Sequence, residues 1–217
     1  MLTIKNISFR YDIELSFLFK DLSFEASDGD IVSISGKSGS GKTTLLNILC
    51  GVIPKIIHGE LDGKVFIKDQ DISKLTLPQT APCISLLMQE PDQQLFFPTV
   101  EQELAFAPEN LKVPKEKIEE TISSVLLELN IESLRFEETA FLSFGQKKLV
   151  TFASILTLSP DIFLLDEPSA GLSKKYIEKI SSIIKKLSES GKIIFIADHN
   201  KDLLSMANKK IVLDKIS

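Results

Sequence analysis

The sequence has 217 residues, of which 43% are hydrophobic and 25% are charged, and its formal net charge is −5. A chain of this length and composition can bury a core of its own, so we expect a single domain over residues 1–217. The negative charge argues against a general nucleic-acid binder, which normally carries a basic face. Two small basic clusters, Lys147–Lys148 and Lys174–Lys175, are interpreted as solvated faces.

The apolar runs and the cysteines of the sequence indicate the cellular compartment of the protein. Residues 1–11 lack the basic and then apolar pattern of a secretory signal, and no run reaches the ~18 apolar residues that span a bilayer. Cys50 and Cys83 are too few for a disulfide framework and are not spaced as a metal-binding pair, which favours a reducing compartment. We expect a cytoplasmic protein that reaches a membrane only through a partner.

The first part of the chain predicts strands followed by a loop and a helix. Short apolar or alternating runs at residues 2–9, 17–24 and 31–35 are typical of strands, each closed by polar or glycine residues. The third run ends at a glycine-rich loop, and residues 43–50 then have a helical composition.

The remainder predicts a helical insertion and a return to strands. After a segment punctuated by prolines, residues 115–129 carry apolar side chains at helical spacing, and we place an inserted, mainly helical subdomain at about residues 90–145. Apolar runs at residues 162–165 and 193–197 then flank an amphipathic helix over residues 175–187. Parallel strands joined by helices predict an α/β core.

The glycine-rich loop matches the phosphate-binding pattern G-x-x-x-x-G-K-[ST]. Its glycines let successive N–H groups converge on phosphate oxygens at the positive end of a helix. Lys42 is expected to reach the β- and γ-phosphates, and the Thr43 hydroxyl is expected to bind Mg²⁺. The alternative is a glycine–serine turn that matches the pattern by chance. The predicted strand before the loop and the predicted helix after it disfavour this alternative, because a chance turn would not require them. The residues assigned to ATP binding in this loop are Gly36, Lys37, Ser38, Gly39, Ser40, Gly41, Lys42, Thr43 and Thr44.

Two carboxylates, Asp166 and Glu167, end the predicted strand that begins at Ile162. Ligands of open α/β sheets bind at the carboxyl ends of strands, so these acids should lie near the phosphates. Asp166 suits a contact to Mg²⁺, and Glu167 suits the polarisation of a water for attack on the γ-phosphate. Such a pair alone more often begins a surface turn. Combined with the phosphate loop, it favours a nucleotide hydrolase.

The segment Leu142–Gln146, Leu-Ser-Phe-Gly-Gln, resembles the signature L-S-G-G-Q of the ABC ATPases. Other elements stand in that family's order: Tyr11 is similar to the aromatic residue that stacks on adenine, and Gln89 to the glutamine of the Q-loop. Ser169–Leu172 is similar to the D-loop and His199 to the switch histidine. Singly, Tyr11, Gln89 and His199 would be ordinary strand or surface residues. The resemblance covers essentially the whole chain and implies a P-loop NTPase core with an antiparallel β subdomain and the inserted helical subdomain.

The resemblance also implies a mechanism that needs two subunits. The phosphate loop of one subunit would hold ATP, and Ser143, Gly145 and Gln146 of the other would cover the γ-phosphate from a helix that begins near Gln146. That helix terminus would add positive charge. The resemblance assigns hydrolysis to Gln89, Glu167 and His199, and Mg²⁺ binding to Thr43, Gln89 and Asp166.

Within the family, the run from Met88 to Phe106 resembles the ATPases of energy-coupling-factor importers, which take up vitamins and metal ions. This implies integral membrane transporter subunits and a second ABC ATPase subunit, identical or homologous, as partners at the inner face of the cell membrane. Leu95, Phe96 and Phe97 are expected to line a groove for a cytoplasmic helix of the membrane partner, with burial in the subdomain core as the alternative. The transported substrate is chosen by other subunits.

Three positions depart from the family pattern. Phe144 replaces a glycine of the signature, Leu149 an arginine that commonly follows it, and Ser173 the aspartate that usually closes the D-loop. Energy-coupling-factor ATPases also usually continue beyond the position of Leu213. Glu167 and His199 are intact, so we expect ATP hydrolysis. The sequence does not determine whether the two composite sites of the dimer hydrolyse ATP at equal rates.

Two other functions compete with the transport ATPase, which remains the leading hypothesis. A soluble ATP-dependent regulator, or a weakly hydrolysing partner subunit, stays an alternative because of the departures in the signature and the D-loop. An ABC-type protein that acts on nucleic acid or ribosomes is disfavoured, because the sequence shows no heptad pattern of long coiled coils and no second cassette.

Overall fold

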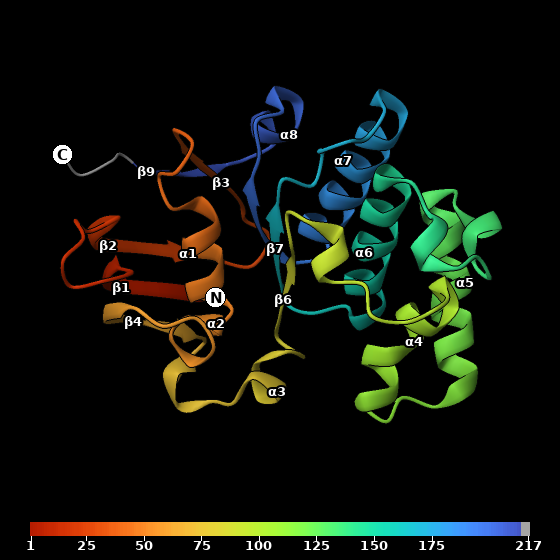
Figure 1. The fold of residues 1–217 in the computed structure, drawn as a ribbon, viewed down its shortest axis with the longest axis horizontal. Helices are drawn as coiled ribbons and strands as arrows, with labels where there is room; N and C mark the ends of the chain where they lie inside the picture. Colours follow the sequence, from red (N-terminus) through yellow and green to blue (C-terminus); the bar gives the residue numbers. More distant parts are fainter. Residues whose placement is uncertain (214–217) are drawn as a thin grey trace.

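The computed structural model describes residues 1–213 and contains an antiparallel and a parallel sheet (Figure 1). The expected departure beyond Leu213 lies outside this range. The antiparallel sheet has the order β2-β1-β4-β5, and the parallel sheet has the order β6-β7-β8-β3-β9. The strands are β1 Leu2–Arg10, β2 Phe19–Ala26, β3 Ile31–Gly36, β4 Glu60–Ile67, β5 Gln70–Asp71, β6 Ile84–Leu87, β7 Ile162–Asp166, β8 Ile193–Ala197 and β9 Lys209–Leu213.

Helices cover both faces of the parallel sheet, which confirms the α/β prediction. Helix α1 lies between the two sheets, whereas α6 and α7 lie on the opposite face, with α4 and α5 beyond them (Figure 1). The α-helices are α1 Lys42–Leu49, α2 Val52–Lys55, α3 Leu77–Thr80, α4 Val100–Asn110, α5 Lys115–Leu129, α6 Phe144–Leu158, α7 Lys174–Glu189 and α8 Lys201–Ser205. Short 3₁₀ turns are η1 Ile72–Lys74, η2 Pro91–Gln93, η3 Glu132–Leu134 and η4 Thr139–Phe141.

The strands β7 and β8 are buried along their whole length. Successive side chains of a strand point to opposite faces of the sheet. Ile162 and Leu164 therefore join the core on the side of α1, while Phe163 and Leu165 join the core under α4 to α7. A strand buried on both faces must be apolar at every position, which explains the unbroken apolar run that marked it in the sequence.

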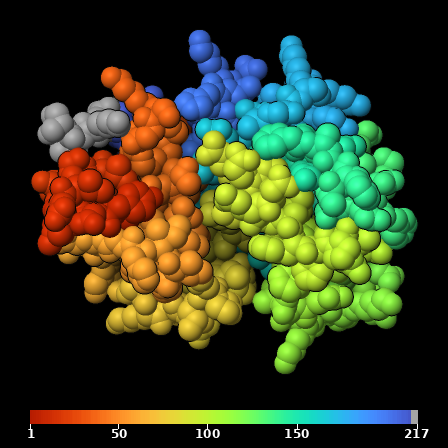
Figure 2. All heavy atoms as spheres, viewed as in Figure 1, coloured from red at the N-terminus to blue at the C-terminus, as the bar shows by residue number. Residues whose placement is uncertain are grey.

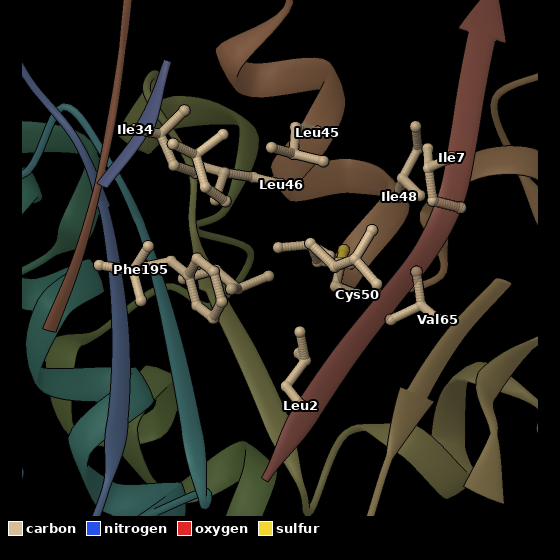
Figure 3. Packing of buried hydrophobic residues seen from close by; sticks show 14 of the residues in the cluster. Leu2, Ile7, Ile34, Leu45, Leu46, Ile48, Cys50, Val65 and Phe195 are labelled. Atoms are coloured by element: carbon tan, nitrogen blue, oxygen red, sulfur yellow. The ribbon is translucent and has the colours of Figure 1, made fainter. Parts of the chain in front are cut away.

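The core on the α1 side joins the two sheets through one helix. Figure 3 shows Leu45, Leu46 and Ile48 of α1 between Ile7 of β1 and the parallel sheet, where Phe195 projects toward the same cluster. This packing fixes α1, and with it the loop that precedes α1, against the carboxyl ends of the parallel strands.

The helical part carries its own capping signals. Helix α5 has the bounds that its apolar spacing predicted, and it ends at Asn130, which adopts the left-handed conformation. Helix α6 begins at Phe144 rather than near Gln146, because the Ser143 side chain accepts a hydrogen bond from the Gln146 N–H and the Gln146 side-chain oxygen accepts one from the Ser143 N–H. The two residues thus form a capping box.

The helices α4 and α5 form the yellow-green and green lobe on the right of the face in Figure 2, away from the red N-terminal sheet on the left. Within residues 1–213, no helix has both the length and the apolar character needed to cross a bilayer.

We expect Phe195→Ala to lower the free energy of unfolding by about 3–5 kcal/mol, because it leaves a cavity between β8 and α1. Phe195 has no exposed surface. Urea unfolding followed by circular dichroism measures the change. Ile13→Ala, at a side chain that is 71% exposed, is the control and should change it by less than about 0.5 kcal/mol. Equal losses in the two variants would contradict the core described above.

Candidate nucleotide site

The loop between β3 and α1 has a backbone that requires glycine. Gly41 has φ 94°, in the left-handed region that favours glycine, and it precedes the first residue of α1. A Cβ on Gly36 would lie 2.3 Å from Ser40 Oγ and 2.5 Å from the Leu213 carbonyl oxygen. The loop therefore folds closely over the end of β3, with the N–H groups of the first turn of α1 left free for a ligand.

Two polar side chains of this loop, Ser40 and Lys42, face inward. Lys42 Nζ donates to the carbonyl oxygens of Gly36 and Lys37, at 3.2 Å and 3.4 Å. Ser40 Oγ is buried and has no hydrogen-bond partner among the described residues. An ammonium held only by carbonyl oxygens, beside an unpaired hydroxyl, is suited to a bound group rich in oxygen acceptors, such as a polyphosphate.

The acidic pair lies directly beside the loop. The Thr43 hydroxyl donates to Asp166 Oδ2 at 2.7 Å, which joins the start of α1 to the end of β7. Burial raises the pKa of Asp166, and the nearby negative charge of Glu167 raises it further. The hydrogen bond from Thr43 and the charges of Lys148 and Lys42 act in the opposite direction.

Glu167 has a backbone conformation that side chains rarely adopt, with φ 46°. Its N–H donates to the Ala197 carbonyl oxygen at 2.7 Å, so the neighbouring strand β8 holds it there. Its carboxylate accepts a hydrogen bond from Gln89 Nε2 at 3.2 Å, and His199 Nε2 lies 3.8 Å from its other oxygen. Gln89 and His199, both predicted to act in hydrolysis, thus lie on either side of the carboxylate of the third such residue, Glu167.

A cavity of about 270 Å³ connects these groups. Tyr11 lies at its edge, where its hydroxyl is 2.8 Å from Thr44 Oγ1 and its ring packs edge-on against Phe9. Leu18 also lines the cavity, although it belongs to no motif in the sequence. The lining residues are Tyr11, Leu18, Ser38, Gly39, Gly41, Lys42, Thr43, Thr44, Gln89, Asp166, Glu167 and His199.

The residues of the expected signature lie elsewhere. Ser143, Gly145 and Gln146 stand at the N-terminus of α6 and are not among the described residues that line the cavity. Ser143 is exposed. Within one chain, therefore, the signature does not reach the site that the phosphate loop and the acidic pair form.

Comparisons with known proteins agree with this arrangement. A family model described as "ABC transporter" matches residues 19–170. The chain belongs to the ABC transporter family. The energy-coupling factor transporter ATP-binding protein EcfA of Methanocaldococcus jannaschii is 34% identical over 209 residues, which cover 95% of this chain and 73% of that protein.

Two solved structures of the family are similar over the whole chain. CbiO1 of Clostridium perfringens, part of the ABC transporter complex CbiONQ, has 27% identity and a TM-score of 0.82, and 86% of that chain is covered. The ATP-binding cassette MJ0796, a dimer in a post-hydrolysis state bound to ADP and Pi, has 25% identity and a TM-score of 0.87, with 97% covered. The chain spans only 38% to 45% of the length of several other curated relatives.

Two residues of this ABC chain to which the sequence assigned no role in the site hold the site's backbone. Lys148 is fully buried, so the prediction that Lys147–Lys148 is a solvated face is wrong for Lys148, although Lys174 and Lys175 are exposed as predicted. The sequence alone does not show whether a lysine beside an apolar helix face is exposed or buried. Burial requires hydrogen-bond acceptors for its ammonium group, and the fold brings three backbone carbonyl groups to Lys148.

The second residue is Asp198, which follows β8 and is buried. Its carboxylate accepts hydrogen bonds from the N–H and the hydroxyl of Ser169 and from the N–H groups of His199 and Asn200. The D-loop and the loop of the predicted switch histidine are thereby tied to one side chain. The signal in the sequence that could have indicated this role is the position of Asp198 directly before the predicted switch histidine, His199.

Two of the expected departures from the family signature have structural partners. The Phe144 ring lies against Gly171, where a Cβ would come within 2.4 Å of the ring. Leu149 is buried in the apolar core beneath α6. Ser173 stands before the first residue of α7 and makes no side-chain cap bond there.

We expect Lys42→Ala to weaken ATP binding at least about tenfold, because it removes a charged hydrogen-bond donor from the loop. Titration calorimetry with a non-hydrolysable ATP analogue measures the affinity. Lys186→Ala, which removes an exposed lysine on α7, is the control and should bind as the parent protein does. Parent-like affinity in Lys42→Ala would exclude this loop as the phosphate site.

Proposed function

We propose that this chain binds and hydrolyses ATP as one subunit of an ATP-sandwich dimer that energises a membrane importer, of the energy-coupling-factor type, for a vitamin or a metal ion. The observation that carries the proposal is the meeting of the phosphate loop with Gln89, Glu167 and His199 in one cavity. The similarity to EcfA and CbiO1 supports the transporter class. The chain would act in the cytoplasm, held at the inner face of the membrane by its partners.

The proposed hydrolysis uses Glu167 to accept the proton of the attacking water. Its carboxylate opens into the cavity and accepts a hydrogen bond from Gln89 on one oxygen, while His199 Nε2 lies 3.8 Å from the other. Lys42 and the free N–H groups of the loop would stabilise the negative charge that moves onto the departing ADP and the transferred phosphoryl group.

The donor set beside the loop fits Mg²⁺. Thr43 and Asp166 present a hydroxyl and a carboxylate oxygen, which are the hard ligands that Mg²⁺ takes. Gln89 is the third proposed ligand. In residues 1–213 no group of three or more histidine, cysteine or acidic side chains could hold a metal alone, so the proposed ion would take its remaining ligands from phosphate oxygens and water. When bound, Mg²⁺ would neutralise charge on the phosphates.

The second half of the site is proposed to come from another ABC subunit. Ser143, Gly145 and Gln146 stand at the start of a 15-residue helix, whose N-terminus attracts anions, yet they do not line their own chain's cavity. The dimeric post-hydrolysis structure of MJ0796, bound to ADP and Pi, supports the sandwich.

A weakly hydrolysing partner subunit, or a soluble ATP-dependent regulator, is the second candidate. The Phe144 ring against Gly171 favours it, because the ring fills space beside the D-loop and ties that loop to the signature. Direct assay of turnover, alone and with a homologous cassette, separates the two candidates.

We expect Glu167→Gln to keep ATP affinity but to slow hydrolysis at least ~10²-fold, since an amide cannot accept the proton of water. ATP should then hold the dimer together, which light scattering detects. Glu128→Gln, on the surface of α5, is the control. Normal turnover in Glu167→Gln would remove the proposed base.

The docking groove for the membrane partner is proposed to lie between α4 and α5, where a depression of about 630 Å³ has an apolar floor and a largely acidic rim. It is lined by Phe97, Glu101, Gln102, Ala105, Glu109, Val113, Lys115, Ile118, Glu119 and Ile122. An amphipathic helix with basic residues at its edges fits this chemistry.

The three residues expected to line the groove together occupy different environments. Leu95 packs against the helical core, Phe96 is 77% exposed, and Phe97 lines the groove and packs against Phe106 with ring centres 4.8 Å apart. Of the two alternatives, burial in the subdomain core therefore holds for Leu95 and a position in the groove holds for Phe97. Both occur in one run because successive side chains point in different directions.

We expect Ala105→Arg to abolish co-purification with membrane subunits and to leave ATP affinity unchanged, because it places a bulky cation on the groove floor. Leu127→Arg, at an exposed position of α5 away from the groove, is the matched control. Pull-down from detergent extracts, with ATP-analogue titration of the same samples, measures both properties. Retained membrane partners in Ala105→Arg would exclude the groove.

A further inference from the structure

Lys148 is the fifth residue of α6, and its side chain is fully buried. Its Nζ donates to the carbonyl oxygens of Met88 at 2.8 Å, Gln89 at 2.9 Å and Asp166 at 3.2 Å. An ammonium has three N–H donors, so each can be matched by one of these carbonyl groups. The lysine thus joins three segments: α6, the segment after β6, and the end of β7 (Figure 1).

Simple filling of space does not explain this lysine. Burial of a charge is costly unless it is hydrogen-bonded and balanced, and an apolar side chain of similar length would fill the volume without that cost. Burial lowers the pKa of Lys148 to about 8, although the negative charges of Asp166, Glu167, Asp198 and Glu90 oppose the shift. The ammonium group instead fixes backbone orientation, because three carbonyl groups, from the segment after β6 and from the end of β7, must point at one nitrogen atom.

The fixed backbones carry the groups proposed for hydrolysis. Gln89 Nε2 reaches Glu167 across 3.2 Å, and that bond depends on the positions of both main chains. Lys148 binds the Gln89 carbonyl group directly and the Asp166 carbonyl group, which is part of the peptide bond to Glu167. Movement of either segment relative to α6 would therefore break both an ammonium bond and the alignment of Gln89 with Glu167.

We propose that Lys148 is a positioning residue that locks the backbones of Gln89 and Asp166 to α6, so that the Gln89 side chain and the catalytic acid Glu167 keep their mutual alignment. The inference rests on the hydrolytic function proposed above. Lys148 does not line the cavity, so it acts through the residues that it holds.

The first test is a double-mutant cycle between Lys148→Met and Gln89→Ala, assayed by steady-state ATP hydrolysis. We expect Lys148→Met to lower kcat by about 10- to 100-fold, with ATP affinity changed less than about twofold. Gln89→Ala should slow the parent protein but have little further effect in Lys148→Met, because the glutamine is already misplaced there. Fully additive losses would overturn the proposal.

The matched control is Lys55→Met. Lys55 Nζ also donates to a backbone carbonyl group, that of Ile72 at 2.8 Å, but it lies outside the cavity. We expect this variant to keep the parent kcat. An equal loss of kcat in Lys55→Met would mean that removal of any such lysine impairs the protein, and it would also overturn the proposal.

The second test does not depend on hydrolysis. Hydrogen–deuterium exchange of the nucleotide-free Lys148→Met protein should be at least about tenfold faster for the amides of residues 88–90 and of Asp166 and Glu167, with the core strands β3 and β8 unchanged. Uniformly faster exchange, or no change at these segments, would refute the positioning role. Lys148→Gln, which keeps one donor group, provides the same comparison if the methionine variant does not fold, and its effect should be smaller.

The two tests separate the proposals. A parent protein that binds ATP but never hydrolyses it, with any homologous cassette, would exclude the proposed function, and the exchange experiment would still decide whether Lys148 locks the two backbones. Normal hydrolysis in the parent with additive losses in the cycle would exclude the role of Lys148 alone.

Discussion

The hydrogen bond between Thr43 and Asp166 joins two parts of the site that lie far apart in the chain. It can form only because α1 is packed between the two sheets and because β7 runs through the centre of the molecule, buried on both faces. The phosphate loop follows β3 and the acidic pair ends β7, so each is fixed by its own strand of the same sheet. The geometry of the site is thus set by the packing of the parallel sheet, and the carboxyl ends of its strands determine where the loops converge.

Backbone positions near the acids are held by side chains that do not enter the cavity. The left-handed conformation of Glu167 is stabilised by the Ala197 carbonyl group, Lys148 binds the carbonyl groups of Gln89 and Asp166, and Asp198 collects the N–H groups of the adjoining loops. Strained conformations persist only where the surroundings determine them fully. A buried acid and a buried lysine placed around one strand end can supply that constraint, because each directs several backbone groups at once.

The sequence predicted the elements whose signals are local. The phosphate loop, the helix over residues 115–129 and the strands around Phe163 and Phe195 follow from glycine spacing, helical periodicity and unbroken apolar runs, and all of them are present. It could not predict Lys148 or Leu18, because their roles depend on neighbours that are distant in the chain. The start of α6 was misplaced because a serine that belongs to a motif also caps the helix.

The segment that follows β6 connects the cavity with the groove on the helical side. Gln89 faces the cavity, while Phe97, a few residues later, lines the groove. This segment has little regular structure, yet side chains hold both of its ends: Gln94 accepts a hydrogen bond from the Met88 N–H, and Glu103 of α4 accepts from the N–H groups of Phe96 and Phe97. Because Glu103 is buried, the bonds at the groove end are shielded from water and strengthened. A helix seated in the proposed groove would therefore contact Phe97, only eight residues along the chain from Gln89, so this segment is the direct covalent link between the groove and the cavity.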